Sequence, residues 1–156
     1  MSAEAPRDAI QVVLDTNVLL SLYVFADSRF AALRQQIESR HWQAVTNDAC
    51  RAEFTRVLNY PMFDLAADAQ KIALAQYQSA AREITIPLAP TAPIVLPRCT
   101  DADDQKFLEL ARDSGAALLI TSDKALLKLS RRLIKSGMFR VITPDAALTQ
   151  IQITSR

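Results

Sequence analysis

Short apolar runs alternate with helical stretches along this chain, and the alternation limits its fold more than any other feature. The first run, Ile10–Leu14, is rich in β-branched residues and is typical of a strand buried on both faces of a parallel sheet. Further runs of strand length stand at 42–45, 84–86, 117–120 and 139–142. Strands separated by helices favour an α/β domain with a mainly parallel sheet of about five strands.

Capping residues set the expected helix boundaries. Ser28 can cap a helix that reaches Ser39, and Asn47 can cap one that runs to about residue 59. Thr143 and Pro144 suit the cap and first position of a terminal helix. Other helices are expected at 68–83, at 104–113 before Gly115, and at 124–135 before Gly137.

Length and charge indicate one domain without a global electrostatic signal. Half of the 156 residues are apolar, enough for one core. We expect a flexible tail at 1–8, a single domain at 9–150 and a C-terminal tail at 151–156, with the proline-rich segment 87–97 as a connector. Because 18 basic residues face 17 acidic ones, any basic surface must be local.

The cysteines and the hydropathy pattern indicate a soluble, cytoplasmic protein. Cys50 and Cys99 are far apart and form no CxxC spacing, which disfavours a disulfide framework or a zinc site. The chain has no signal-like start, and no apolar run approaches the roughly 18 to 20 residues of a membrane span. We therefore expect reduced thiols and no membrane partner.

Two aspartates directly follow expected strands. Asp15 ends the first strand and Asp123 follows the fourth. In open parallel sheets the ligand site lies at the carboxyl ends of the strands, which favours a functional role for both. Either residue could instead serve only as the cap of the next helix.

Glu53 stands where a core residue is expected. On a helical wheel it falls in the same arc as Cys50 and Phe54. Burial of an unpaired carboxylate is costly, so such a residue needs a cation, a hydrogen-bond network or a metal ion. The alternative is a salt bridge with an arginine elsewhere.

Asp104 shows the same pattern, because it shares a helix face with Phe107 and Ala111. Its alternative is a first-turn position favoured by the helix dipole, which Asp101 and Asp103 could fill equally well. The four acids Asp15, Glu53, Asp104 and Asp123 would suit a hard cation, Mg²⁺ or Mn²⁺, that activates water against a phosphodiester. His41 is expected at the surface, away from this set.

With the acids in this order, residues 10–148 resemble the PIN domain family, metal-dependent ribonucleases that include VapC-type toxins of toxin–antitoxin pairs. Four segments carry the resemblance: Val13–Leu19 (VLDTNVL), Glu53–Leu58 (EFTRVL) with Pro61, Asp101–Ala111 (DADDQKFLELA) and Leu119–Asp123 (LITSD). Each motif alone is weak, but the four in order at these separations are fairly specific.

The resemblance implies a three-layer α/β/α sandwich, a Mg²⁺- or Mn²⁺-dependent endoribonuclease with RNA as substrate, a homodimer, and an antitoxin protein as possible partner. It assigns Asp15, Glu53 and Asp104 as core metal ligands and Asp123 as the more variable fourth, with the choice among Asp101, Asp103 and Asp104 open. Residues expected to hold the acids or a water in a second shell are Thr16, Asn17, Asp101, Thr121 and Ser122.

Three alternatives are open at this point. A haloacid-dehalogenase-like phosphatase needs a second acid two residues after the first, where this chain has Asn17. A phosphorelay receiver domain needs an acid pair after the first strand and an aspartate after the third. The non-enzyme alternative is a nuclease-like fold kept only to bind RNA or protein.

Basic residues follow Asp123 at helical spacing. Lys124, Lys128, Arg131 and Lys135 would form one stripe on a continuous helix, opposite Leu126, Leu127, Leu129, Leu133 and Ile134. Such a stripe could follow an RNA backbone from the metal site outward. The alternatives are an ordinary solvated face or a docking face for an acidic antitoxin.

Overall fold

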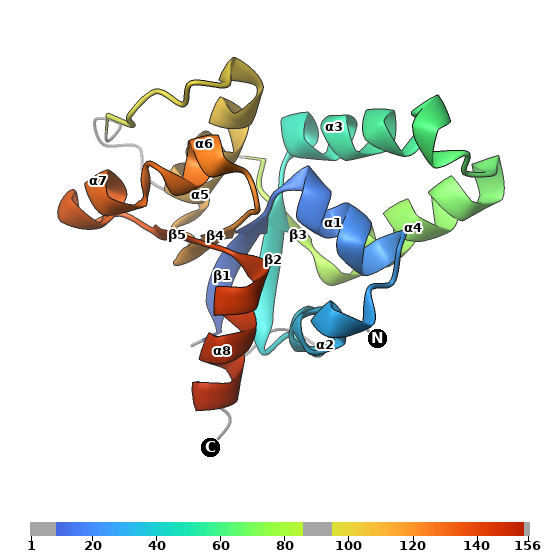
Figure 1. The fold of residues 1–156 in the computed structure, drawn as a ribbon, viewed down its shortest axis with the longest axis horizontal. Coiled ribbons are helices and arrows are strands. Elements are labelled where there is room, and N and C mark those ends of the chain that lie inside the picture. Colours follow the sequence, from blue (N-terminus) through green and yellow to red (C-terminus); the bar gives the residue numbers. More distant parts are fainter. Residues whose placement is uncertain (1–8, 86–94, 155–156) are drawn as a thin grey trace.

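A five-stranded parallel sheet forms the centre of the computed structural model, which describes residues 9–85 and 95–154. The strands lie in the order β3-β2-β1-β4-β5, and each pairs in parallel with its neighbours (Figure 1). Their bounds are β1 Ile10–Leu14, β2 Trp42–Thr46, β3 Arg82–Glu83, β4 Leu118–Ile120 and β5 Arg140–Ile142. The predicted α/β class is confirmed.

Side chains of alternate residues in the strands enter two separate cores. Val12 belongs to one core cluster and its neighbour Val13 to the other, because successive side chains in a strand point to opposite faces. The register aligns equivalent residues across the sheet: Val12 with Ala44 and Leu118, and Val13 with Val45 and Leu119. Burial on both faces explains why these strands have continuous apolar runs.

Helices cover both faces and complete the predicted α/β/α sandwich (Figure 1). The larger core lies under α1 Thr16–Tyr23, α2 Ala31–Glu38, α3 Asp48–Leu58, α4 Ala67–Ala80 and α8 Pro144–Thr154. The smaller core lies under α5 Gln105–Ser114, α6 Lys124–Leu127 and α7 Ser130–Lys135. Single 3-10 turns stand at η1 Ser28–Phe30, η2 Pro61–Phe63 and η3 Ala102–Asp104.

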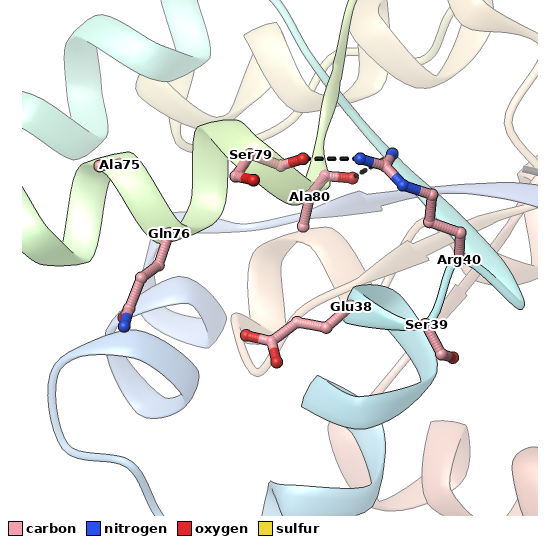
Figure 2. A pocket seen from close by; sticks show the side chains of 7 residues that line it. All are labelled: Glu38, Ser39, Arg40, Ala75, Gln76, Ser79 and Ala80. Carbon is pink, nitrogen blue, oxygen red and sulfur yellow. Dashed lines mark hydrogen bonds between the residues drawn. The ribbon is translucent and has the colours of Figure 1, made fainter. Parts of the chain in front are cut away.

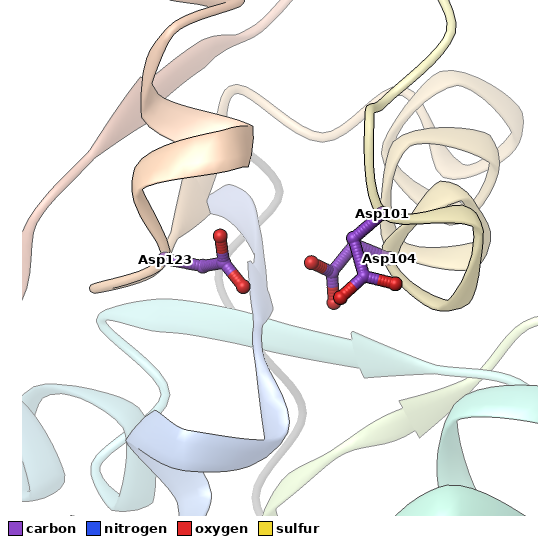
Figure 3. A group of neighbouring side chains, drawn as sticks. All are labelled: Asp101, Asp104 and Asp123. Carbon is purple, nitrogen blue, oxygen red and sulfur yellow. The ribbon is translucent and has the colours of Figure 1, made fainter.

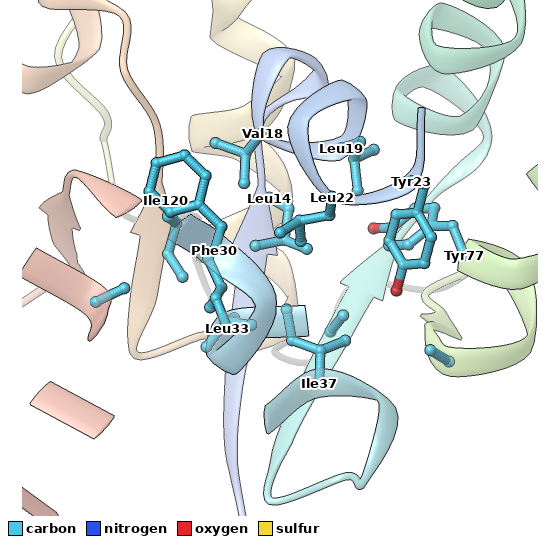
Figure 4. Packing of buried hydrophobic residues seen from close by; sticks show 14 of the residues in the cluster. Leu14, Val18, Leu19, Leu22, Tyr23, Phe30, Leu33, Ile37, Tyr77 and Ile120 are labelled. Atoms are coloured by element: carbon cyan, nitrogen blue, oxygen red, sulfur yellow. The ribbon is translucent and has the colours of Figure 1, made fainter. Parts of the chain in front are cut away.

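The larger core fixes α1, which begins at the end of β1. Leu19 and Leu22 of this helix pack with Leu33 and Ile37 of α2 in one buried cluster (Figure 4). Tyr77 of α4 is fully buried in the same cluster. Burial of such large side chains contributes roughly 1.5 to 3 kcal/mol each, so the start of α1 is held rigidly beside the sheet edge.

Several predicted caps are confirmed. The side chain of Asn47 accepts a hydrogen bond from Cys50 N at 2.9 Å and starts α3, and Thr143 Oγ1 accepts one from Ala146 N at 3.1 Å and starts α8. Gly115 ends α5 with a φ of 71°, in the left-handed region that favours glycine. The prediction that Ser28 caps a helix is wrong: Asp27 accepts from Arg29 N, a 3-10 turn follows, and α2 starts at Ala31.

The third strand lies two residues before its predicted position at 84–86. Arg82 and Glu83 form β3, and Ile84 N continues the pairing with a hydrogen bond of 2.8 Å to Thr46 O, whereas residue 86 lies outside the described residues. Both β3 residues are exposed and charged, as is usual for an edge strand. Because neither residue is apolar, the hydrophobic pattern of the sequence did not predict this strand at Arg82 and Glu83.

The ends of the predicted domain have different outcomes. Residues 1–8, the predicted N-terminal tail, lie outside the described residues. At the other end α8 runs to Thr154 and Ile151 is buried, so residues 151–154 of the predicted C-terminal tail form the last turn of this helix, and residues 155–156 lie outside the described residues. Within the described part of the chain, the helices are too short or too polar to cross a membrane.

Candidate metal centre

The acidic residues lie near the point where the strand order of the sheet reverses, between β1 and β4. From β1 the chain builds one half of the sheet through β2 and β3, and the other half through β4 and β5. The carboxyl ends of the two strands at such a switch point, here β1 and β4, border the usual ligand crevice of an open α/β sheet. Asp15 follows β1, and its backbone N donates to Ile120 O of β4 at 3.1 Å.

Asp15 is a buried carboxylate held by two donors. Asn17 N donates to its Oδ1 at 2.7 Å, and the Thr121 hydroxyl donates to its Oδ2. Burial raises the pKa of Asp15 above its ordinary value, and the charges of Asp123 and Glu53 act in the same direction. Asp15 therefore lies close enough to Asp123 and Glu53 for their charges to affect its pKa.

Thr121 connects the ends of β1 and β4. Besides donating to Asp15, its hydroxyl oxygen accepts a hydrogen bond from Asp123 N at 2.9 Å. Asp123 itself caps α6 through Ala125 N at 2.8 Å. Asp123 therefore does cap the next helix, as the alternative interpretation of the sequence proposed. The cap uses Oδ1, so Oδ2 of Asp123 is left for other contacts.

Three aspartates present oxygens to a common point. One carboxylate oxygen each from Asp101, Asp104 and Asp123 lies within 4.8 Å of the others, and Figure 3 shows Asp104 and Asp123 facing each other from two chain segments. Asp104 Oδ2 is buried and has no hydrogen-bond partner among the described residues. Burial raises the pKa of Asp104 to about 7, and a hydrogen bond with the Asp123 side chain and the charges of Asp123, Asp101 and Asp15 act in the same direction.

This arrangement fits a divalent cation. An ion with carboxylate ligands would pair the buried Asp104 oxygen and offset the repulsion among the three acids. Two clustered acids, Asp104 and Asp123, belong to the predicted ligand set, with Asp15 beside them.

Asp101 lies in the cluster itself, although the sequence placed it in a second shell. The cause is local: Ala102–Asp104 form a 3-10 turn, not the start of an α-helix. With three residues per turn, Asp101 and Asp104 lie on the same side and their carboxylates join the cluster, to which Asp103 does not belong. A 3-10 turn is short, and the sequence carried no signal that separated it from the first turn of a helix.

Glu53 has a different environment from the three aspartates. Its Oε1 lies 2.6 Å from Lys106 Nζ and 3.9 Å from Arg56 Nη2, while its Oε2 accepts a hydrogen bond from the Thr16 hydroxyl. The salt bridge considered from the sequence is present, with a lysine as the nearer partner. Sequence reasoning missed Lys106, because its position two residues after Asp104 did not show that α5 packs against α3.

Comparison with known families is consistent with this geometry. The sequence profile of the PIN domain matches residues 11–125. The chain belongs to the PIN domain family. No curated protein matches the chain. PIN domains are generally nucleases, and the observed strand order also differs from the 2-1-3-4-5 order of receiver domains.

The other residues that were predicted to hold the acids or a water occupy different positions in this PIN domain. Thr16 is buried against Glu53, and Asn17 contributes its backbone N to Asp15 while its side chain is exposed. Ser122 is exposed. His41 is exposed too, and its ring lies 2.6 Å from Ser39 Oγ at the amino edge of the sheet, away from the acids.

The basic residues after Asp123 do not form the predicted stripe on one helix. Lys128 and Leu129 form a turn between α6 and α7, in which Leu129 N bonds to Leu126 O in place of an α-helical acceptor. Because the helix is interrupted, the helical spacing of the four basic residues no longer places them on one face. Ile134, predicted on the apolar side, is 50% exposed. The four basic residues Lys124, Lys128, Arg131 and Lys135 are all exposed.

A hollow of the PIN domain lies between the end of α2 and α4. It is lined by Arg40, Gln76 and Ser79 among others, and the Arg40 guanidinium donates to the carbonyls of Ser79 and Ala80 (Figure 2). These bonds satisfy carbonyls at the C-terminus of α4. The hollow lies at the amino edge of the sheet, opposite the acids. Its arginine, Arg40, stabilises the end of α4.

Proposed function

We propose that this protein is a Mg²⁺- or Mn²⁺-dependent endoribonuclease whose metal site comprises Asp101, Asp104 and Asp123, with Asp15 beside them. The observation that carries the proposal is the buried, unpartnered Asp104 Oδ2 in a cluster of carboxylate oxygens at the switch point of the sheet. Family membership supports nuclease chemistry at this site.

The donor set favours a hard cation over other catalytic groups. Carboxylate oxygens are preferred ligands of Mg²⁺ and Mn²⁺, and a bound ion would lower the pKa of a water and polarise a phosphodiester. Thiol chemistry does not fit, because burial raises the pKa of both free cysteines, that of Cys50 to about 12 and that of Cys99 above its ordinary value. The chain's own contribution is to hold the acids: Thr121 orients Asp15 and fixes the backbone of Asp123.

Basic residues around the acids would bind the RNA backbone. Lys124 follows Asp123 directly and is exposed, and Arg56 is exposed on α3 beside Glu53. Contacts from such side chains to phosphates position a nucleic acid without reading its sequence. We propose that this surface holds the strand across the acidic cluster.

The toxin role, the homodimer and the antitoxin partner belong to the same proposal and rest on the resemblance to VapC-type toxins. Large apolar side chains such as Phe25 and Met62 are 58% and 79% exposed, which supports a surface that contacts another protein. The mass of the purified protein in solution tests the homodimer, and expression with the product of the neighbouring gene tests the antitoxin.

One experiment tests the core of the proposal. Purified protein is incubated with end-labelled RNA in Mn²⁺ or in chelator, and Asp104→Asn is run in parallel to exclude a contaminating nuclease. Cleavage by the unaltered protein in Mn²⁺ alone is the expected result. If RNA is bound but stays intact, the chain is a binding module that has kept the nuclease fold.

A further inference from the structure

The acids at the sheet edge fall into two halves with opposite surroundings. Asp101, Asp104 and Asp123 face one another, and Asp104 carries a buried oxygen without a partner. Glu53, on the other side, has both oxygens engaged by donors. A cation would therefore stabilise the ionised acids of the first half, whereas the second half already contains one.

Lys106 is the cation of the second half. Its Nζ lies 2.6 Å from Glu53 Oε1, and the two side chains are only 21% and 12% exposed. Because this pair is shielded from water, it is worth more than an exposed surface pair. The Thr16 hydroxyl holds the other oxygen of Glu53, so the carboxylate is fixed in position.

The position of Lys106 on its helix indicates that the Glu53 carboxylate stabilises the Lys106 ammonium. Lys106 lies in the first turn of α5, where the helix dipole disfavours a positive charge. The packing of α3 against α5, with Cys50 Sγ 4.0 Å from Lys106 O, brings Glu53 to the ammonium. The unfavourable position is therefore offset by a carboxylate from another helix.

We infer that the Lys106 ammonium takes the place of a second metal ion, so that one divalent cation binds per chain in the half formed by Asp101, Asp104 and Asp123. Glu53 is then a positioning residue for Lys106 and not a metal ligand. The inference rests on the proposed function, since it concerns the same site. An ammonium has three N–H donors, and those not used by Glu53 are available to a phosphate oxygen.

Mn²⁺ binding by the full chain tests the inference without reference to activity. Equilibrium dialysis should give one Mn²⁺ for the unaltered protein. The double variant Glu53→Gln with Lys106→Met removes the pair without changing the net charge, and should lower Mn²⁺ affinity by less than about tenfold. Asp104→Asn, which removes a ligand, should lower it by at least about 100-fold, and thermal unfolding checks that each variant is folded.

The single variant Lys106→Met gives a second readout. Removing the ammonium frees Glu53 for metal, so this variant should bind Mn²⁺ more tightly or in greater number than the unaltered protein. Lys71→Met, an exposed lysine on α4, is the matched control and should change neither quantity. Equal binding by the two lysine variants would mean that the ammonium does not compete with metal, and would overturn the inference.

Two further outcomes separate this inference from the proposed function. Two Mn²⁺ per unaltered chain, or a loss of about tenfold or more in the double variant, would make Glu53 a ligand and overturn the inference while the nuclease proposal stands. Absence of Mn²⁺ binding by the unaltered protein would overturn both.

Discussion

The Thr121 hydroxyl donates a hydrogen bond to Asp15 Oδ2, and this bond joins the ends of the two strands that flank the switch point. The same oxygen accepts from Asp123 N, so one hydroxyl positions two acids. Thr121 is fully buried, and water cannot replace it in either bond. The arrangement of the acidic site thus depends on a residue that carries no charge.

Replacement of Thr121 should disturb both the fold and the site. Thr121→Val keeps the shape but leaves Asp15 Oδ2 and Asp123 N without this partner, so the free energy of unfolding should fall by about 1 to 3 kcal/mol. Mn²⁺ affinity should fall by roughly 10- to 100-fold, as for other groups that orient ligands. Denaturant titration and dialysis measure the two effects. Thr121→Ser, which keeps the hydroxyl, is the control, and equal losses in both variants would assign the effect to packing.

Asp104→Asn should separate stability from activity. The change removes a partly buried acid whose negative charge is unfavourable beside Asp101 and Asp123, so above the pKa of Asp104 the metal-free protein should become more stable, while Mn²⁺-dependent RNA cleavage is lost. Asp15→Asn should likewise abolish cleavage. Thermal unfolding in chelator measures the first effect and an RNA cleavage assay the second. Full cleavage by Asp104→Asn would remove this residue from the site.

The stability of the metal-free protein should depend on pH through Asp104. Its pKa is about 7 in the folded chain and 3.8 in the unfolded reference, so between these values the folded state binds more protons than the unfolded state. The free energy of unfolding should therefore decrease as pH rises from about 4 to 7. Urea titrations in chelator across this range measure the slope. Asp104→Asn should flatten it, and an unchanged slope in that variant would assign the effect to another group.

Alanine variants of the three aspartates Asp101, Asp103 and Asp104 should differ in activity. Asp101 and Asp104 share one side of a 3-10 turn and belong to the acidic cluster, whereas Asp103 does not belong to it. Alanine at Asp103 should therefore cost much less Mn²⁺ affinity and cleavage than alanine at Asp101 or Asp104. A greater loss at Asp103 than at Asp104 would show that another face of this turn binds the metal.

The sequence was sufficient for features that depend on local periodicity and was insufficient where distant segments meet. The buried strand Ile10–Leu14 has an unambiguous apolar run, and Asn47 and Thr143 have local capping chemistry, so all three were predicted. The Glu53–Lys106 pair joins residues that are 53 positions apart, and only the packing of α3 on α5 brings them together.

Short elements account for the other differences. The exposed edge strand Arg82–Glu83 has no apolar pattern, and the turn at Lys128 and Leu129 replaces only one α-helical hydrogen bond. Neither feature changes the composition of its segment enough to be recognised. The structure brings Asp104 and Asp123 together as the sequence led us to expect, and it places Thr16 and Thr121 against acids, whereas the role of these acids as metal ligands stays a prediction.

We expect the exposed basic residues after Asp123 to contribute to RNA binding. Lys128 lies in the turn between α6 and α7, and Arg131 lies in the first turn of α7, so each offers a charge to a phosphate although no single helix aligns them. Changing both to glutamate should weaken RNA binding and reduce the slope of log affinity against log salt by roughly 1 to 2, because fewer counterions are released. Mn²⁺ affinity should be unchanged, and Lys71→Glu with Arg29→Glu, at two exposed residues of α4 and η1, is a control of equal charge. If the Lys128 and Arg131 variant binds RNA with the same salt slope as the control, the RNA backbone follows another surface, and Arg56 on α3 becomes the next residue to change.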